Sequence, residues 1–174
     1  MELNEIAAHL EIRQALARYC RGVDRADAAL IRSAFHPDAT DVHGQFSGTG
    51  WELAERLASA ERGQPGAGAH HVTNVYLEFD DPDHARCESY VLAFHPHRDD
   101  GKDGSLAIFA GRYIDRFERR NGDWKISDRR VVNDWSREHV AGDEWARLSS
   151  TAGPYPVGTR SDDEPAYELF PPLT

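Results

Sequence analysis

The spacing of apolar residues changes once along this chain, from a helical period to strict alternation. An apolar stripe of helical period predicts a helix over residues 3–24, and similar patterns predict helices over 26–35 and 51–62. The stripe of the first helix consists of Ile12, Leu16, Tyr19 and Val23. Beyond residue 69 apolar and polar residues alternate, as in half-buried strands. Helices followed by consecutive strands favour an α+β fold with an antiparallel sheet.

The alternating region divides into four strands joined by short polar segments. The predicted strands cover residues 70–79, 85–95, 106–118 and 124–135. Asn121-Gly122 is the strongest turn signal of the sequence and predicts a hairpin. Residues 39–50 are predicted as a weaker strand pair interrupted by glycines, after a break at His36-Pro37-Asp38. A strongly curved sheet can wrap around the helices and leave a pocket between the two layers.

The chain changes character after residue 135, which predicts one domain over 1–135 and a C-terminal extension over 136–174. A helical turn or two is predicted over 137–148, followed by a segment rich in proline and glycine. The extension is apolar enough that we expect it to pack on the domain or on a neighbouring subunit. Its apolar residues include Tyr155, Tyr167, Leu169 and Phe170.

Charge and composition exclude several classes of protein. The 174 residues include 20 basic and 30 acidic side chains, a net charge of −10, which argues against nucleic acid as a partner. Hydrophobic residues make up 40%, too many for a disordered chain. There are only two cysteines, no apolar run of membrane-spanning length and no basic, apolar signal at the start. We therefore expect a cytoplasmic protein that does not contact membranes.

Strand alternation sorts the polar residues of the first long strand. His70, Val72 and Asn74 share a face with Tyr76 and Glu78, and this mixed face is predicted to be a pocket wall. The opposite face is apolar and is predicted to be core or a subunit contact, which favours a homo-oligomer, a dimer or trimer. That second face contains Val75, Leu77 and Phe79.

The last strand contains Arg129 and Arg130 in succession, so one of them is expected to face the interior. A buried guanidinium needs an acidic or ligand partner, and Asp128 or Asp134 would supply a structural salt bridge. Near the end of the first helix, Asp24 follows Tyr19 by five positions. The two converge only if the helix turns or ends near Gly22.

Alone, Asp24 is most simply the N-cap of the second helix, and Asp27 is a further candidate for that cap. The spacing leaves it open whether the carboxylate, phenol, imidazole and guanidinium meet. His95-Pro96-His97 would suit a metal site together with three further histidines, but proline at a strand end favours a loop. Those histidines are His36, His43 and His84. We expect no metal.

Nucleotide and covalent chemistry are not indicated either. The GTG at residues 48–50 lacks the rest of a nucleotide-binding fingerprint, and no serine or cysteine nucleophile motif is present. We therefore expect no cofactor.

Four segments resemble the SnoaL-like branch of the nuclear-transport-factor-2-like superfamily. They are RYCRGVDRADAALIRSAFHPDA (18–39), GTGWELAERL (48–57), HHVTNVYLEF (70–79) and GRYIDRFERRNGDWKISDRRVVNDW (111–135). The resemblance implies a curved antiparallel sheet around three helices, a cone with a deep apolar pocket. Family members of this kind eliminate a small group from cyclic substrates without metal or organic cofactor, although the superfamily also contains non-enzymes.

The resemblance implies a catalytic pair formed by Asp24 of GVD and His70 of HHVTN. Asp24 would fix the tautomer of the imidazole, whose other nitrogen would remove a proton from carbon. Tyr19 matches a family tyrosine that would donate to a carbonyl or leaving hydroxyl. Arg129, with Arg130 as the alternative, matches an arginine that would stabilise the developing anion.

These residues predict a cofactor-independent lyase or isomerase of dehydratase type that acts on a small apolar cyclic substrate. The predicted substrate contacts are Phe35, Trp51, Val72 and Asn74. The alternative is a non-catalytic binding or assembly module that uses the same cone. A contact within about 3.2 Å between Asp24 and His70 at a pocket wall would favour the enzyme, whereas a helix-capping Asp24 and an exposed His70 would favour the module.

Overall fold

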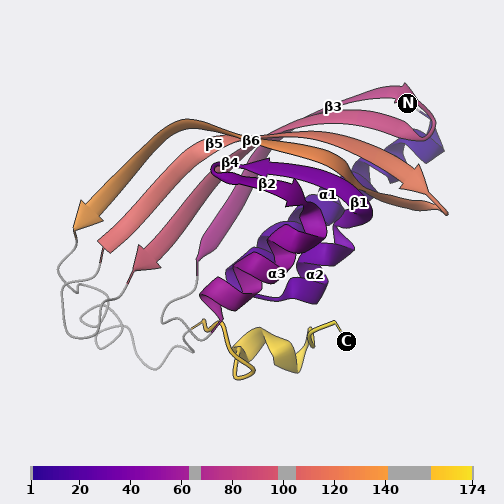
Figure 1. Ribbon diagram of the computed structural model, residues 1–174. Helices are drawn as coiled ribbons and strands as arrows, with labels where there is room; N and C mark the ends of the chain where they lie inside the picture. Colours follow the sequence, from indigo (N-terminus) through magenta and orange to yellow (C-terminus); the bar gives the residue numbers. More distant parts are fainter. Residues whose placement is uncertain (1, 63–67, 98–104, 141–157, 174) are drawn as a thin grey trace.

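The computed structural model describes residues 2–62, 68–97, 105–140 and 158–173. In this part of the chain three helices lie under a curved six-stranded sheet (Figure 1). The helices are α1 (Leu3–Arg25), α2 (Ala28–Ser33), α3 (Gly50–Glu61) and the short 3-10 helix η1 (Pro165–Glu168). The strands are β1 (Phe35–His43), β2 (Phe46–Thr49), β3 (Ala69–Asp81), β4 (His84–His97), β5 (Ser105–Arg120) and β6 (Asp123–Val140). None of the helices in the described ranges is both long and apolar enough to cross a membrane.

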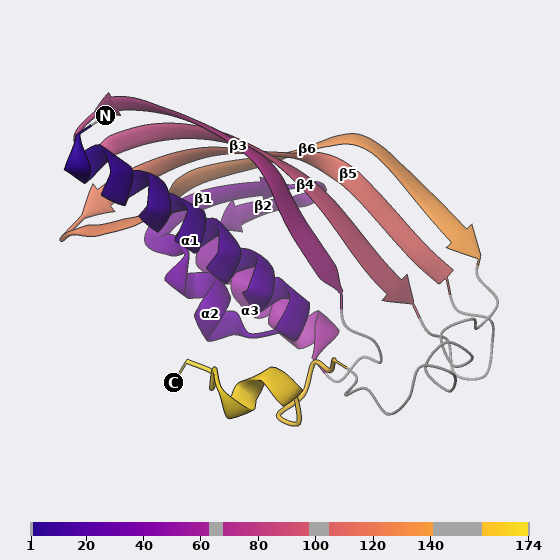
Figure 2. The same cartoon turned by 180° about the vertical axis from the view of Figure 1, so that it is seen from behind.

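The sheet has the order β2-β1-β6-β5-β4-β3, and its long strands bend over the helices (Figures 1 and 2). The predicted α+β fold class, a curved sheet wrapped around three helices, is confirmed. All neighbouring strands are antiparallel except β1 and β6, which run in parallel. No hairpin joins that pair, so no tight turn forces the strands to be antiparallel. The sheet is therefore mixed, and β2 and β3 are its open edges.

Close packing of α1 on α2 depends on Gly22. A Cβ at this position would lie 2.7 Å from Cγ1 of Ile31, closer than real contacts allow. Gly22 does not end the helix, because α1 continues to Arg25 and ends at Ala26, which has a positive φ of 53°. The cap of α2 is Asp27, whose side chain accepts a hydrogen bond from the Leu30 backbone N–H at 2.9 Å. Asp24 is thus free of the capping role.

The predicted turn at residues 121–122 and the predicted break at residues 36–38 have different outcomes. The hairpin between β5 and β6 turns at Asn121 and Gly122, with φ of 55° and 93°, so the predicted hairpin is confirmed. The second helix does end before residues 36–38, as predicted, but it ends at Ser33, and β1 begins at Phe35, earlier than the predicted start of the strand at residue 39. His36 is buried there, and its Nε2 lies 2.9 Å from the carbonyl oxygen of Glu118.

A β-bulge in β3 changes which side chains face the helices. Val72 pairs with Val91 and Val75 with Ser89, so two residues of β3 lie opposite one residue of β4. Strict alternation therefore fails after Val72. Of the two alternatives predicted for the apolar face of this strand, the core is confirmed, because its residues pack against the buried cluster, and the homo-oligomer stays a prediction. These residues are Val75, Leu77 and Phe79.

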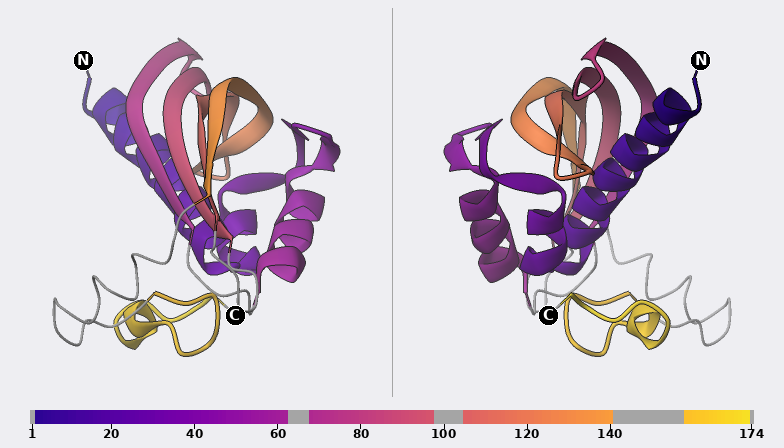
Figure 3. Two further views of the ribbon diagram at one scale, coloured as in Figure 1. Left: turned by 90° about the vertical axis from the view of Figure 1, so that its left-hand side faces the viewer. Right: turned by 90° about the vertical axis from the view of Figure 1, so that its right-hand side faces the viewer.

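The described end of the chain packs against the helix layer. Residues 158–173 lie beyond the ends of α1 and α3, on the side away from the sheet (Figures 1 and 3). Glu164 forms an ion pair with Arg25 at 3.0 Å, and Asp162 forms one with Arg62 at 2.5 Å. The helical turns predicted from residue 137 are wrong up to Val140, because β6 continues to that residue. The rest of that prediction lies outside the described residues.

Candidate functional site

The end of α1 and the start of β3 bring Asp24 and His70 into direct contact. The imidazole Nδ1 lies 2.7 Å from Asp24 Oδ1, and the backbone N–H of His70 donates to Oδ2 at 3.2 Å. Both carboxylate oxygens are thus engaged by one residue, which fixes the carboxylate plane. Because Nδ1 faces a carboxylate, it carries the proton of a neutral ring, and Nε2 is the nitrogen with a free lone pair.

The pair lines a cavity between α1 and β3 with a volume of about 580 Å³. Both side chains are largely buried, with 9% exposure for His70 and 15% for Asp24. The floor of the cavity is apolar and comes from both elements; it includes Leu16, Cys20, Val72 and Val75. Because both side chains are largely buried, electrostatic interactions at the imidazole are stronger than they would be in water.

Cys20 closes the inner side of this cavity without being a nucleophile. Burial raises the pKa of its thiol to about 12, so the thiol is protonated at neutral pH. The same thiol interacts electrostatically with both Arg129 and Asp24. Cys20 is therefore close enough to interact with both the Asp24–His70 pair and a second polar group deeper in the protein.

Arg129 is the centre of that deeper group, the inner cluster formed by Arg129, Asp115, Tyr19, Tyr113 and Asp41. The guanidinium is fully buried and donates from Nε and Nη2 to the two oxygens of Asp115, at 2.8 and 2.7 Å. The rings of Tyr19 and Tyr113 lie 4.2 and 4.1 Å from its carbon. Of the two successive arginines, Arg129 faces the interior, and Arg130 is exposed on the other face of the sheet.

The acidic partner of Arg129 is Asp115, not the predicted Asp128 or Asp134. Burial alone would lower the pKa of the guanidinium, but the charge and hydrogen bonds of Asp115 outweigh burial and raise that pKa well above its ordinary value. Burial also raises the pKa of the neighbouring Tyr19 phenol. The cluster thus holds a charged arginine between two neutral phenols.

Four side-chain atoms of the inner face, from three residues, have no hydrogen-bond partner among the described residues. They are the Nη1 nitrogen of Arg129, the Ser89 hydroxyl and the carboxylate of Asp41, whose two oxygens both lack a partner. Asp41 stands opposite Arg129 in the parallel pairing of β1 with β6. Buried polar groups are normally paired, so this side of the guanidinium retains unused hydrogen-bonding capacity.

The predicted site residues are therefore divided between two places. Asp24 and His70 touch each other, and Tyr19 touches Arg129, but no described hydrogen bond or ring contact joins the two pairs. Val72 lines the cavity, whereas Phe35 is buried in the core against Tyr19 and Arg129.

Two of the predicted substrate contacts are wrong. Asn74 is exposed because the β3 bulge turns it away from the helices. Trp51 is 41% exposed on the outer side of α3, where the Arg32 guanidinium lies over its ring. The helical pattern placed Trp51 beside Ala54, but α3 buries Leu53 and Ala54 instead.

Sequence reasoning missed two residues near the Asp24–His70 pair. The ring of His95 contacts that of His70 edge to face, with centroids 5.1 Å apart. His95 is the last of the alternating residues of β4 that face the helices. Strand alternation alone could therefore have placed it on the inner face of the sheet. Arg160 is buried, and a Cβ at Gly68 would lie 2.9 Å from its Nη2 and 3.6 Å from Asp24 Oδ1. No spacing rule reveals that approach from the distant tail.

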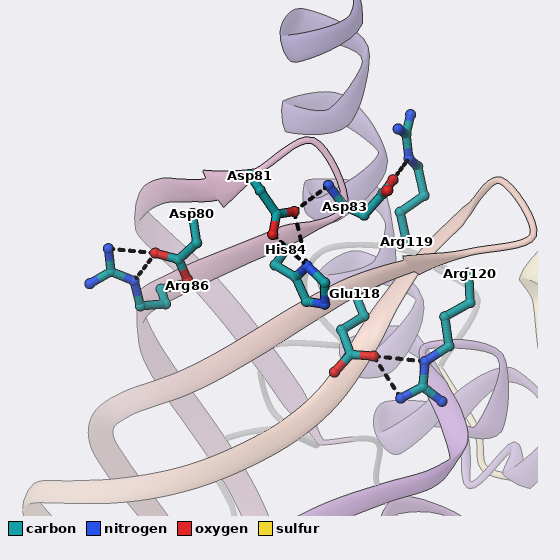
Figure 4. A network of polar contacts seen from close by, with 8 residues as sticks. All are labelled: Asp80, Asp81, Asp83, His84, Arg86, Glu118, Arg119 and Arg120. Carbon is teal, nitrogen blue, oxygen red and sulfur yellow. Dashed lines mark hydrogen bonds and ion pairs between the residues drawn. The ribbon is translucent and has the colours of Figure 1, made fainter.

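Most other charged side chains form exposed pairs away from the cavity. Figure 4 shows one such network at the far end of β3 and β4, where His84 contacts Asp81 and Arg119 contacts Asp83. A hollow of about 480 Å³ on the outer face of the sheet contains neither Asp24 nor His70. Within the described ranges, no three metal-binding side chains are grouped in a way that could hold an ion.

A curved, unclosed sheet over three helices is the fold of the nuclear-transport-factor-2-like class. The chain belongs to the SnoaL-like domain family, whose model matches residues 4–130. No curated protein matches the chain.

Solved structures of similar fold support this assignment. A putative scytalone dehydratase from Novosphingobium aromaticivorans superimposes with a TM-score of 0.66 at 21% identity, over 82% of this chain and 95% of that one. A hexachlorocyclohexane dehydrochlorinase (type 2) gives 0.70 at 24% identity, over 80% and 93%. The type 3 enzyme from Novosphingobium barchaimii gives 0.67 at 22% identity, over 80% and 94%. At these identities the likeness shows the fold alone.

Proposed function

We propose that the protein is a cofactor-independent lyase or isomerase of dehydratase type, in which His70 removes a proton from a carbon atom of a cyclic substrate. The observation that carries the proposal is the 2.7 Å contact between His70 Nδ1 and Asp24 at the wall of the cavity. A helix-capping Asp24, the arrangement expected of a non-catalytic module, is not found, because Asp27 caps α2. The neighbouring dehydratase and dehydrochlorinase structures are consistent with this chemistry.

In the proposed reaction Nε2 of His70 accepts the proton and Asp24 stabilises the imidazolium that forms. The proton comes from the carbon next to a carbonyl, so the electron pair of the broken C–H bond forms an enolate, with the negative charge on the carbonyl oxygen. In dehydration the enolate re-forms the carbonyl, a carbon–carbon double bond conjugated with it forms as the C–O bond to the β-hydroxyl breaks, and the oxygen leaves as water with the proton from the imidazolium. In isomerisation the same proton returns to a different carbon.

Tyr19 and Arg129 enter this proposal as neighbours behind the wall formed by Cys20. Their predicted direct action on the substrate requires a phenol or guanidinium to reach the cavity. It stays a prediction, which Tyr19→Phe tests: a fall in kcat of about 100-fold without loss of folding would show that the phenol donates to the substrate. An unchanged kcat would limit Tyr19 to packing on the guanidinium.

The test of the function is proton exchange at carbon. Hydroxy-ketones, steroid-like ketones and polyketide-like compounds are incubated with the protein in D₂O, and NMR follows deuterium uptake as well as elimination products. We expect the wild type to catalyse exchange or elimination with some of them, and His70→Ala and Asp24→Asn to lose most of that activity. Equal rates for wild type and His70→Ala would refute the proposal, as would no exchange at all with any compound.

A further inference from the structure

The part of the cavity wall that comes from α1 is strongly cationic. Arg13, Arg21 and Arg25 all line it, and with Ala17 they follow one another at four-residue intervals, which places them along one side of the helix. The whole chain carries a net charge of −10, so the charge of this wall is opposite in sign to that of the molecule. A cleft lined by one sign of charge attracts ligands of the other sign.

Only part of this positive charge is balanced within the protein. Arg25 forms an ion pair with Glu164 at 3.0 Å. Arg21 donates to the backbone carbonyl of Phe170 at 3.3 Å and stacks on its ring. Arg13 donates to the carbonyl of Val75 at 3.3 Å. Among the residues that the structure describes, no carboxylate lies within 4.0 Å of the guanidinium of Arg13 or Arg21.

The single carboxylate of the cavity wall does not supply the missing charge. Among the residues that the structure describes, Asp24 is the only acidic one that lines the cavity, and it is held by the ring and backbone of His70. Two arginines of the wall therefore remain without a described anionic partner. Guanidinium groups bind carboxylates in paired hydrogen bonds, which makes an acid group on a ligand the matching chemistry.

The positions of these groups along α1 set how such a ligand would lie. Arg13 and Asp24 are separated by eleven residues, about 16 Å along a helix axis. The apolar floor lies between them and comes from Leu16, Cys20, Val72 and Val75. A ligand with its acid group at Arg13 would cover this floor and extend its other end toward His70.

We propose that the substrate is an anionic, elongated ring compound whose carboxylate binds Arg13. This inference rests on the proposed function and names the substrate class of the same cavity. Arg13 is the binding residue because its only described hydrogen bond is to a backbone carbonyl, whereas Arg21 already holds the C-terminal segment through Phe170. The ring system lies on the apolar floor, and the reacting carbon lies at His70.

The test uses a matched pair of fluorescent probes, anthracene-2-carboxylate and its neutral amide, which have the same rings and differ in charge. We expect the wild type to bind the acid more tightly than the amide. Arg13→Gln should weaken binding of the acid by about five- to tenfold and leave the amide within about twofold. Raising the salt concentration should weaken only the acid, because the cavity mouth is open to solvent.

Arg116→Gln is the matched control, since it removes the same charge from the outer face of the sheet, where Arg116 is exposed. We expect it to bind both probes like the wild type. The proposal is overturned if Arg13→Gln binds the acid as tightly as the wild type, if Arg116→Gln weakens it equally, or if the wild type does not prefer the acid. Binding of the probes involves no proton transfer, so loss of acid recognition in Arg13→Gln is measured separately from loss of catalysis in His70→Ala.

Discussion

At the scale of single residues, the ion pair of Arg129 with Asp115 and that of Arg112 with Asp134 differ mainly in burial. Each arginine donates from Nε and Nη2 to both oxygens of an aspartate on a neighbouring strand. The first pair is fully buried, whereas the side chains of the second are 29% and 38% exposed. The two pairs therefore offer a comparison in which geometry is held constant.

We expect Asp115→Asn to lower the free energy of unfolding by about 3–5 kcal/mol, because it removes the hydrogen-bonded carboxylate partner of a fully buried guanidinium. Asp134→Asn, the same substitution in the exposed pair, should cost less than about 1 kcal/mol because water screens the charge that remains. Urea unfolding followed by tryptophan fluorescence measures both. Equal losses in the two variants would show that burial of Arg129 does not set the cost.

The Asp24–His70 contact was within reach of sequence reasoning because each residue sits in a recognisable segment at an element boundary. Three other contacts of the site could not be predicted from the sequence in this way. The acidic partner of Arg129, the ring contact of His95 and the approach of Arg160 all depend on pairing between strands or on the path of the tail. Residue types alone do not contain that information.

At the scale of elements, single-residue bulges decided which predictions held. Near the turn, Arg120 pairs with Asp123, and Phe117 pairs with Ile126. If this register continued without a shift, Asp128 would lie opposite Asp115. A shift at Ser127 instead puts Arg129 opposite Asp115 and turns it inward. The hairpin turn could be predicted from Asn-Gly, whereas the bulge, which depends on the partner strand and the core, could not.

The junction of α1 and α2 supplies a prediction at this scale. An added methyl group in Gly22→Ala would meet Cγ1 of Ile31 at 2.7 Å and its backbone nitrogen at 2.8 Å. Because one of these atoms belongs to the backbone, the helices must separate. We expect a loss of about 1–3 kcal/mol in the free energy of unfolding.

Separation of α1 from α2 would also move Asp24, which lies two residues beyond Gly22 on the same helix, away from His70. The Gly22→Ala variant should therefore lose activity even at temperatures where it is fully folded. Proton-exchange rates at carbon, measured below the unfolding transition, test this. A folded variant with wild-type exchange would show that the helix junction does not position the carboxylate.

At the scale of the whole molecule, the layer between sheet and helices holds buried thiols and phenols in their neutral form. Cys20 and Cys87 are both buried and free, and burial raises the pKa of each thiol to about 12. Burial likewise raises the pKa of the Tyr19 and Tyr113 phenols. In the unfolded chain the thiols ionise near pH 8.5 and the phenols near pH 10.

These differences in pKa between the folded and the unfolded chain predict that the free energy of unfolding falls as the pH rises above 8, before the phenols ionise. A group with a raised pKa in the folded state contributes stability that is complete below its unfolded pKa and is lost as the pH rises toward its folded pKa. Between pH 8 and pH 10 each thiol should therefore cost about 2 kcal/mol, because only the unfolded chain releases its proton.

Urea unfolding at pH 8, 9 and 10 measures this loss in the wild type and in the double variant Cys20→Ala/Cys87→Ala. The double variant is less stable at pH 8, because it loses two buried sulfur atoms, but its stability should depend much less on pH over this range. Since both proteins share every other ionisable group, the difference in slope isolates the thiols. Parallel slopes would mean that the inner layer admits water and lets the thiols ionise in the folded protein.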